Sequence, residues 1–284
     1  MSQADPLVTA AWLKARIAAP DLRTVDASWF LPGSGRDPDA EFLERHIPGS
    51  VRLDIDAVSD RAIPLPHMLP DPMAFAQTVG EMGLGSEHRI VVYASEGILP
   101  AARVWWMFRV MGHDAVTVLD GGLAKWLAIR GPLQAGPAAS RPPARFRARF
   151  RKDLVRSFDQ VAETLEQGTA QVVDVRPAPR FRGEAPEPRP GLRPGHMPGA
   201  LNAPYAELIA PDGTLKAKAA LQKAFAHAHV ALDRPIVTSC GSGVSAAVTA
   251  LALARLGLWD VAVYDGSWAE WGGRDDAAVV IGAA

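Results

Sequence analysis

The chain has 284 residues, of which 48% are hydrophobic and 21% are charged, and its formal net charge is -1. This length fits about two domains, each with its own core. The near-zero net charge gives no overall attraction to nucleic acid or to an anionic membrane surface, and no apolar run is long enough to span a bilayer. We therefore expect neither a nucleic-acid partner nor membrane association.

Cys240 is the only cysteine, so the sequence offers no disulfide framework and no multi-cysteine metal site. We expect no metal ligands. A single cysteine suits a reducing compartment, and residues 1–20 lack the charged start and apolar core of a signal peptide. Within them, residues 10–17 favour an amphipathic helix. The expected location is the cytoplasm.

Four short motifs recur in the same order in the two halves of the chain. The pairs are Thr24–Asp26 with Val172–Asp174, His46–Gly49 with His196–Gly199, Ile90–Tyr93 with Ile236–Ser239, and Asp120–Trp126 with Asp265–Trp271. The members of each pair lie 145 to 150 residues apart, which is too far for a solenoid of short repeats. The sequence predicts a duplicated domain, with copies at 1–132 and 156–284 and a linker over 133–155.

Each half alternates short β-branched runs with helical stretches. In the first half, a predicted strand over 90–93 is followed by a predicted helix over 101–112 and a strand over 115–119. This alternation predicts two α/β domains, each with a mainly parallel sheet flanked by helices. Ligand sites in such domains lie at the carboxyl ends of strands.

Two proline-rich segments connect or interrupt these elements. Between the halves, arginine alternates with apolar residues from 145 to 151. Because the net charge is near zero, we expect an extended linker here rather than a nucleic-acid patch, with Phe146 and Phe150 packed against the domains and the arginines solvated. The second segment, residues 179–198, is predicted to be a long loop.

Cys240 lies between a predicted strand over 236–238 and a predicted helix over 244–256, which Gly257 closes in the left-handed conformation. Gly241 and Gly243 let the backbone curl so that successive amide N–H groups point inward at the helix N-terminus. A lone cysteine is more often a small buried hydrophobic residue. A thiolate surrounded by inward-pointing amide N–H groups, however, is stabilised. We therefore expect a nucleophile.

Two further positions narrow the chemistry. Phosphatases with this geometry place an arginine six positions after the cysteine, where this chain has Ala246, so phosphate chemistry is not expected. In the first copy, Ala94 takes the place of Cys240. The first domain is therefore expected to keep the fold without the nucleophile.

The loop over 240–246, the two His-x-Pro-Gly turns and the tandem repeat resemble the rhodanese superfamily. The resemblance covers nearly the whole chain. It implies an inactive N-terminal rhodanese domain and a catalytic C-terminal one. The cysteine of such a protein takes sulfur from a donor, forms a persulfide and passes the sulfur to a thiol or to cyanide. No cofactor is implied.

The donor is suggested by the loop. Thiosulfate-specific members carry basic residues at the positions of Gly241 and Ser242, and a cationic loop suits a dianion. The neutral loop resembles that of members that use 3-mercaptopyruvate, a monoanion, and the implied acceptor is thioredoxin or a low-molecular-weight thiol. Thiosulfate as the donor, and a non-catalytic binding module, are the alternatives.

The resemblance also implies a role for each site residue. Cys240 is the nucleophile, and the residues that cradle its persulfide are Gly241, Ser242, Gly243, Val244 and Ser245. Arg180 and Arg189 match the substrate-binding arginines, whose forked donors suit a 2-keto acid. His67 and Asp56 match a histidine and an aspartate that the family brings across the domain interface toward Ser242. A Ser242–His67–Asp56 arrangement would orient a hydroxyl and relay a proton.

The remaining candidates are expected to be structural or solvated. Arg182 and Arg193 are interpreted as exposed arginines of the proline-rich loop, and His46 and His196 as structural residues of their turns. Five tryptophans are assigned to the core: Trp105, Trp106, Trp126, Trp268 and Trp271.

Overall fold

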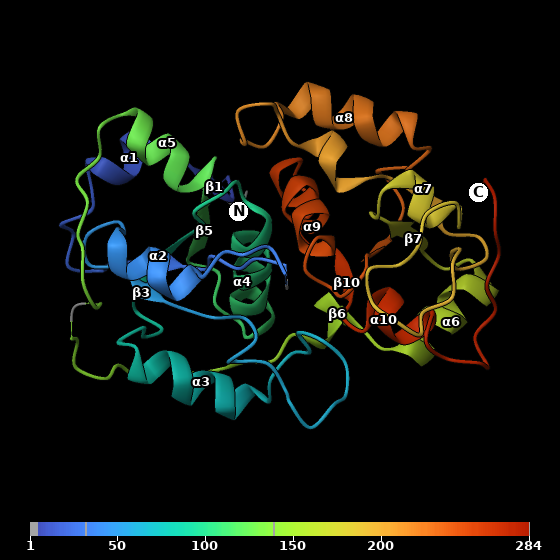
Figure 1. Cartoon of the computed structure of the whole chain (residues 1–284), viewed down its shortest axis with the longest axis horizontal. Coiled ribbons are helices and arrows are strands. Elements are labelled where there is room, and N and C mark those ends of the chain that lie inside the picture. The colour runs from blue at the N-terminus through green and yellow to red at the C-terminus, as the bar shows by residue number, and fades with distance from the viewer. Residues whose placement is uncertain (1–4, 32, 139, 284) are drawn as a thin grey trace.

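The computed structural model describes residues 5–31, 33–138 and 140–283. It contains two five-stranded sheets, which lie side by side in Figure 1 as the centres of two lobes. The strand orders are β1-β5-β4-β2-β3 and β6-β10-β9-β7-β8. All the pairings of these strands are parallel. The same order in both sheets confirms the expected fold class, two α/β copies with parallel sheets.

The first sheet consists of β1 (Leu7–Val8), β2 (Leu22–Asp26), β3 (Val51–Arg52), β4 (Arg89–Tyr93) and β5 (Val116–Leu119). The helices of this half are α1 (Ala10–Lys14), α2 (Pro38–Glu44), α3 (Pro72–Glu81), α4 (Leu99–Val110) and α5 (Gly122–Ala128). Local signals set where α2 and α3 begin. The carboxylates of Asp37 and Asp71 accept amide N–H groups of the first turns, and a proline follows each aspartate.

The second sheet consists of β6 (Val155–Arg156), β7 (Gln171–Asp174), β8 (Leu201–Asn202), β9 (Ile236–Ser239) and β10 (Ala262–Tyr264). Its helices are α6 (Phe158–Gln167), α7 (Ala178–Phe181), α8 (Lys218–His227), α9 (Ala246–Arg255) and α10 (Ser267–Trp271), with short 3-10 helices η1 (Lys152–Leu154) and η2 (Tyr205–Leu208). The predicted strand before Cys240 and the helix after it are β9 and α9. Gly257 has φ +101°, so the left-handed closure of α9 is confirmed.

Both proline-rich segments differ in part from the expectation. The short helix α7 begins the segment predicted as a loop, because Pro177 and Pro179 occupy the cap and first turn, where proline is tolerated. In the linker, Phe146 is buried as expected, but Phe150 is 49% exposed. Phe150 lines an open cleft between the domains instead of packing in a core.

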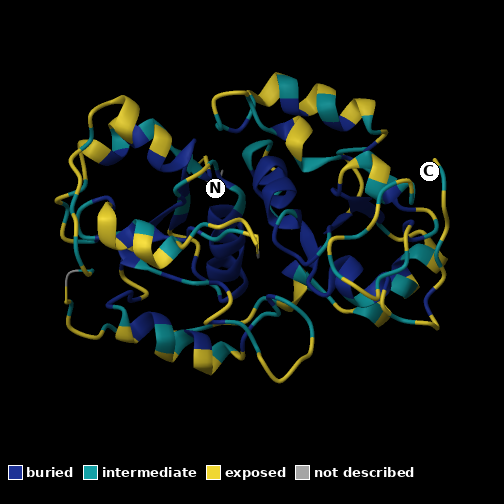
Figure 2. Ribbon diagram, in the orientation of Figure 1, coloured by how far each residue is buried: buried dark blue, intermediate teal, exposed yellow. Residues whose placement is uncertain are grey.

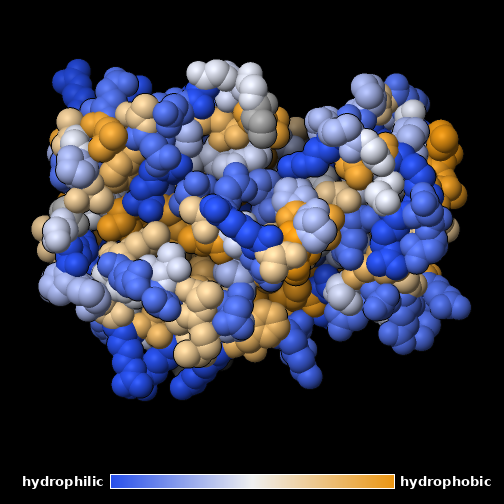
Figure 3. All heavy atoms as spheres, turned by 60° about the horizontal axis from the view of Figure 1, so that its bottom comes forward, coloured by the Kyte–Doolittle hydropathy of each residue, from blue (hydrophilic) through white to orange (hydrophobic). Residues whose placement is uncertain are grey.

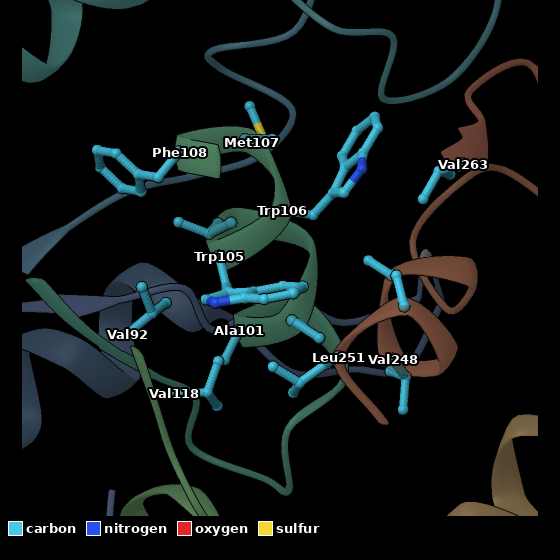
Figure 4. Packing of buried hydrophobic residues seen from close by; sticks show 14 of the residues in the cluster. Val92, Ala101, Trp105, Trp106, Met107, Phe108, Val118, Val248, Leu251 and Val263 are labelled. Carbon is cyan, nitrogen blue, oxygen red and sulfur yellow. The ribbon is translucent and has the colours of Figure 1, made fainter. Parts of the chain in front are cut away.

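Helices α4 and α9 pack against each other where the two lobes meet, and Figure 2 shows both as buried. Trp105 and Trp106 of α4 belong to the same core cluster as Val248 and Leu251 of α9. Figure 4 shows Leu251 of α9 near the indole of Trp105, whereas the Trp106 indole lies on the side of Val263. The largest core therefore crosses the domain boundary, which places side chains of the first domain next to the loop of the second.

The surface shown in Figure 3 is largely hydrophilic, and its apolar patches are interrupted by hydrophilic residues. No helix within the described ranges is long and apolar enough to cross a membrane.

Candidate active site

Cys240 lies directly after β9 and is 1% exposed. Gly243 has φ +77°, and a Cβ atom there would lie 2.9 Å from the carbonyl oxygen of Asp265, so only glycine fits. Among the described residues no acceptor is found for the other amide N–H groups of the loop, those of Gly241, Ser242, Val244, Ser245 and Ala246. These groups are available to bind an anion at the start of α9.

Ser267, the first residue of α10, binds the backbone of the cysteine loop through its side chain. The sequence analysis did not assign this role. The Oγ of Ser267 accepts the amide N–H groups of Cys240 and Gly243, each at 3.1 Å, and donates to the carbonyl of Tyr264 at 2.8 Å. The same Oγ lies 4.0 Å from Sγ of Cys240. One hydroxyl thus sets the position of the backbone on both sides of the loop.

The repeat contained a signal for Ser267. The equivalent residue in the first copy is Gly122, 145 positions earlier. Both residues are left-handed, with φ +59° for Gly122 and φ +50° for Ser267. A serine in this conformation costs about 1–2 kcal/mol relative to glycine. The strained serine occurs only in the copy that carries the cysteine, which is the pattern expected of a functional position.

Two arginines from the segment after β7 lie beside the loop. A Cβ atom on Gly241 would lie 3.2 Å from NH2 of Arg180, so this guanidinium rests against the loop backbone. Arg189 is close enough to Cys240 and Asp56 to interact electrostatically with both. Burial lowers the pKa of its guanidinium, and these two groups oppose that shift. The structure thus brings both predicted substrate-binding arginines to the cysteine.

A chain of buried ion pairs positions the guanidinium of Arg180. Glu187 contacts NH2 of Arg180 at 2.5 Å and NH1 of Arg176 at 2.8 Å, and Arg176 contacts Asp174 at 2.6 Å. The side chain of Glu187 is 1% exposed, whereas that of Arg180 is 22% exposed. The solvent-accessible guanidinium is therefore oriented by a carboxylate that solvent does not reach.

His67 reaches the site from the first domain. Its Nδ1 lies 2.6 Å from Oδ1 of Asp56, and Trp29 donates its indole N–H to Oδ2 of the same carboxylate at 2.7 Å. The ring of Trp29 meets the His67 ring edge-on, with 5.0 Å between centroids. The close contact with His67, followed by the hydrogen bond from Trp29, lowers the pKa of Asp56. Trp29 is a second site residue that the sequence analysis missed.

Ser242 is 8% exposed and belongs to the loop, as predicted. The hydrogen bonds of the described residues include none between Ser242 and His67. Instead, Nε2 of His67 lies 3.4 Å from NH2 of Arg189. The structure therefore pairs His67 with Asp56 and Arg189, and the relay through Ser242 stays a prediction.

The residues expected to be structural are so, with one correction. His46 and His196 are buried, and each stacks on a phenylalanine and contacts that phenylalanine's carbonyl through Nδ1. The five tryptophans assigned to the core are buried. Arg182 pairs with Glu184 at the surface. The expectation that Arg193 is simply exposed is wrong, because it donates to the carbonyls of Trp271, Gly272 and Arg274.

Comparison with known proteins matches the rhodanese-like domain family twice, over residues 9–129 and 157–274. Human 3-mercaptopyruvate sulfurtransferase is 44% identical over 93% of this chain and 91% of its own length. Bovine thiosulfate sulfurtransferase is 42% identical over 93% of this chain and 91% of its own length. SseA from Escherichia coli, a 3-mercaptopyruvate sulfotransferase of known structure, gives a TM-score of 0.86 at 41% identity, covering 94% of this chain and 100% of its own.

The two family matches fall one on each sheet, and the solved structure extends over both lobes. The resemblance identified from the cysteine loop and the repeat is therefore confirmed. The protein belongs to the rhodanese family, with two rhodanese-like domains in tandem.

Proposed function

We propose that this protein is a 3-mercaptopyruvate sulfurtransferase. One observation carries the proposal: a buried cysteine in an amide-lined loop has its cationic neighbours, Arg180 and Arg189, outside the loop, while Gly241 and Ser242 carry no charge. Overall identity does not separate the donors, since the human and bovine relatives are 44% and 42% identical. The loop and its two arginines favour a 2-keto acid monoanion over thiosulfate.

The first half-reaction follows from this arrangement. Arg180 and Arg189 bind the carboxylate and ketone of 3-mercaptopyruvate, and the Cys240 thiolate attacks the substrate sulfur. A sulfur–sulfur bond forms, the carbon–sulfur bond breaks, and its electron pair passes to the enolate of pyruvate. The proton of the substrate thiol is transferred to that enolate carbon with help from His67 and Ser242. The products are pyruvate and a Cys240 persulfide anion, which the loop amides hold.

The second half-reaction regenerates the enzyme. A thiol acceptor, thioredoxin or a low-molecular-weight thiol, attacks the outer sulfur of the persulfide. It leaves as a persulfide itself, and Cys240 returns to the thiolate. Because a free thiol must be present both on the enzyme and on the acceptor, we assign the protein to a reducing compartment, the cytoplasm.

The donor preference is tested by comparing 3-mercaptopyruvate with thiosulfate under the same conditions. We expect kcat/KM to be at least about tenfold higher for 3-mercaptopyruvate, the ratio that about 1.4 kcal/mol of preferential transition-state binding produces. Intact-protein mass after mixing with each donor reports the persulfide directly. A faster reaction with thiosulfate would make the protein a thiosulfate sulfurtransferase, and no sulfur gain from either donor would favour a binding module.

The substrate-binding role of Arg180 is tested against its neighbour Arg182. We expect Arg180→Leu to lower kcat/KM for 3-mercaptopyruvate by about 10- to 100-fold, the usual effect of losing a charge-assisted hydrogen bond. Glu187 keeps Arg176 as a partner, so the fold should persist. Arg182→Leu removes a partly exposed arginine at the end of the same helix, and it should leave kcat/KM unchanged. Equal effects of the two substitutions would contradict the assignment.

A further inference from the structure

A buried ion pair crosses the domain boundary beneath the site. Arg103, on α4 of the first domain, is 0% exposed, and its NH1 lies 2.7 Å from Oδ1 of Asp265, which follows β10 of the second domain. The guanidinium carbon also lies 4.5 Å from the ring centroid of Trp106. Asp265 directly precedes Gly266 and Ser267, and Ser267 holds the cysteine loop.

Both partners of this pair bind the backbone of the turn that carries His67. NH2 of Arg103 donates to the carbonyl of His67, and Oδ2 of Asp265 accepts the amide N–H of Leu69 at 2.7 Å. His67 has φ +59°, a left-handed conformation that costs a residue other than glycine some strain. NH1 of Arg103 also lies 3.4 Å from the carbonyl of Gly243. The pair thus fixes a strained turn of one domain against the cysteine loop of the other.

Stability alone does not account for such a pair. The cost of desolvating two charges commonly cancels their attraction, and apolar residues of similar size often stabilise a protein equally well. The first copy of the repeat, which has no cysteine, makes the equivalent contact at the other end of the interface. That contact shows which interactions the duplicated fold forms where no reactive site is present. There Asp120, the counterpart of Asp265, accepts the amide N–H of Leu215 from the second domain at 2.8 Å. Its cation partner, Arg255, is 3.9 Å away.

We propose that Arg103 and Asp265 are positioning residues for catalysis. By holding the backbone of residues 67–69 at two points, they set the distance of the His67 ring from Cys240 and Arg189. A displacement of about 1 Å in a catalytic group can lower the rate about 100-fold. This inference rests on the catalytic role proposed for His67, and it assigns to the first domain a share in the reaction beyond that residue itself.

The test is a double-mutant cycle with 3-mercaptopyruvate. Arg103→Lys keeps the positive charge but loses the forked N–H donors of the guanidinium. Asp265→Asn keeps a side-chain oxygen that can accept a hydrogen bond but loses the negative charge. We expect each to lower kcat about 10- to 100-fold with little change in KM. In a His67→Ala background, the same substitutions should change kcat by less than about twofold, because the group they position is gone. Asp120→Asn changes the equivalent residue at the other end of the interface, and it should leave kcat unchanged.

Three outcomes with the single variants and with His67→Ala would overturn the inference. They are wild-type kcat for both single variants, effects that multiply with that of His67→Ala, and a His67→Ala variant with wild-type activity. In the last case, persulfide formation by the wild type would leave the proposed sulfur transfer standing. Where a single variant fails to fold, Arg103→Met with Asp265→Leu removes both charges together and should unfold cooperatively like the wild type. A folded double variant with wild-type kcat would also overturn the inference.

Discussion

Replacing Cys240 by serine is expected to abolish sulfur transfer from every donor. A serine hydroxyl is not ionised at neutral pH and does not form a persulfide, so the first half-reaction has no nucleophile. The substitution is nearly isosteric at a position that is 1% exposed, and the amide of residue 240 still donates to Ser267. We therefore expect the variant to fold, with circular dichroism and a thermal midpoint close to those of the wild type.

The measurement is intact-protein mass after mixing each protein with 3-mercaptopyruvate. The wild type should gain one sulfur atom, and treatment with a reducing thiol should remove it. Since Cys240 is the only cysteine, no other thiol of the chain could carry that sulfur. A sulfur gain by Cys240→Ser would place the transfer at another residue. It would refute the mechanism whether or not the variant keeps the wild-type fold.

The sequence predicts best what local patterns determine. The β-branched run before Cys240 and the alanine-rich run after it predict β9 and α9, because burial and helix propensity act over neighbouring residues. The recurrence of four motifs predicts a duplicated domain, and the two sheets share one strand order. The cysteine loop could likewise be predicted, since the glycine at 243 is required by a backbone angle.

The rest of the site depends on packing between domains. Arg103 lies in an apolar stretch that predicts a buried helix, and nothing in its neighbours indicates a partner 162 positions later at Asp265. Trp29 has no role assigned from the sequence, and yet its indole N–H donates to the carboxylate that contacts His67. Periodicity reports which face of an element is buried. It does not report which element of another domain covers that face.

The second large effect is expected on stability. Glu187→Gln should lower the free energy of unfolding by about 3 kcal/mol, because removing one partner of a buried ion pair leaves an uncompensated charge. Two arginines contact this carboxylate, and Arg176 is as buried as Glu187, with 1% of each side chain exposed. Arg176 keeps Asp174, which holds the expected loss near the lower end of the range for such substitutions. Urea unfolding followed by circular dichroism measures the change.

Glu184→Gln is the matched control, since Glu184 pairs with Arg182 at the surface, where the two side chains are 54% and 37% exposed. Solvent screens such a pair, so the urea midpoint of Glu184→Gln should equal that of the wild type. Glu187→Gln should also raise KM for 3-mercaptopyruvate, because Arg180 loses the carboxylate that orients its fork. A lower midpoint with an unchanged KM would show that Glu187 stabilises the second domain without orienting Arg180. Equal midpoints for the two variants would instead mean that the chain Asp174–Arg176–Glu187 is hydrated in solution.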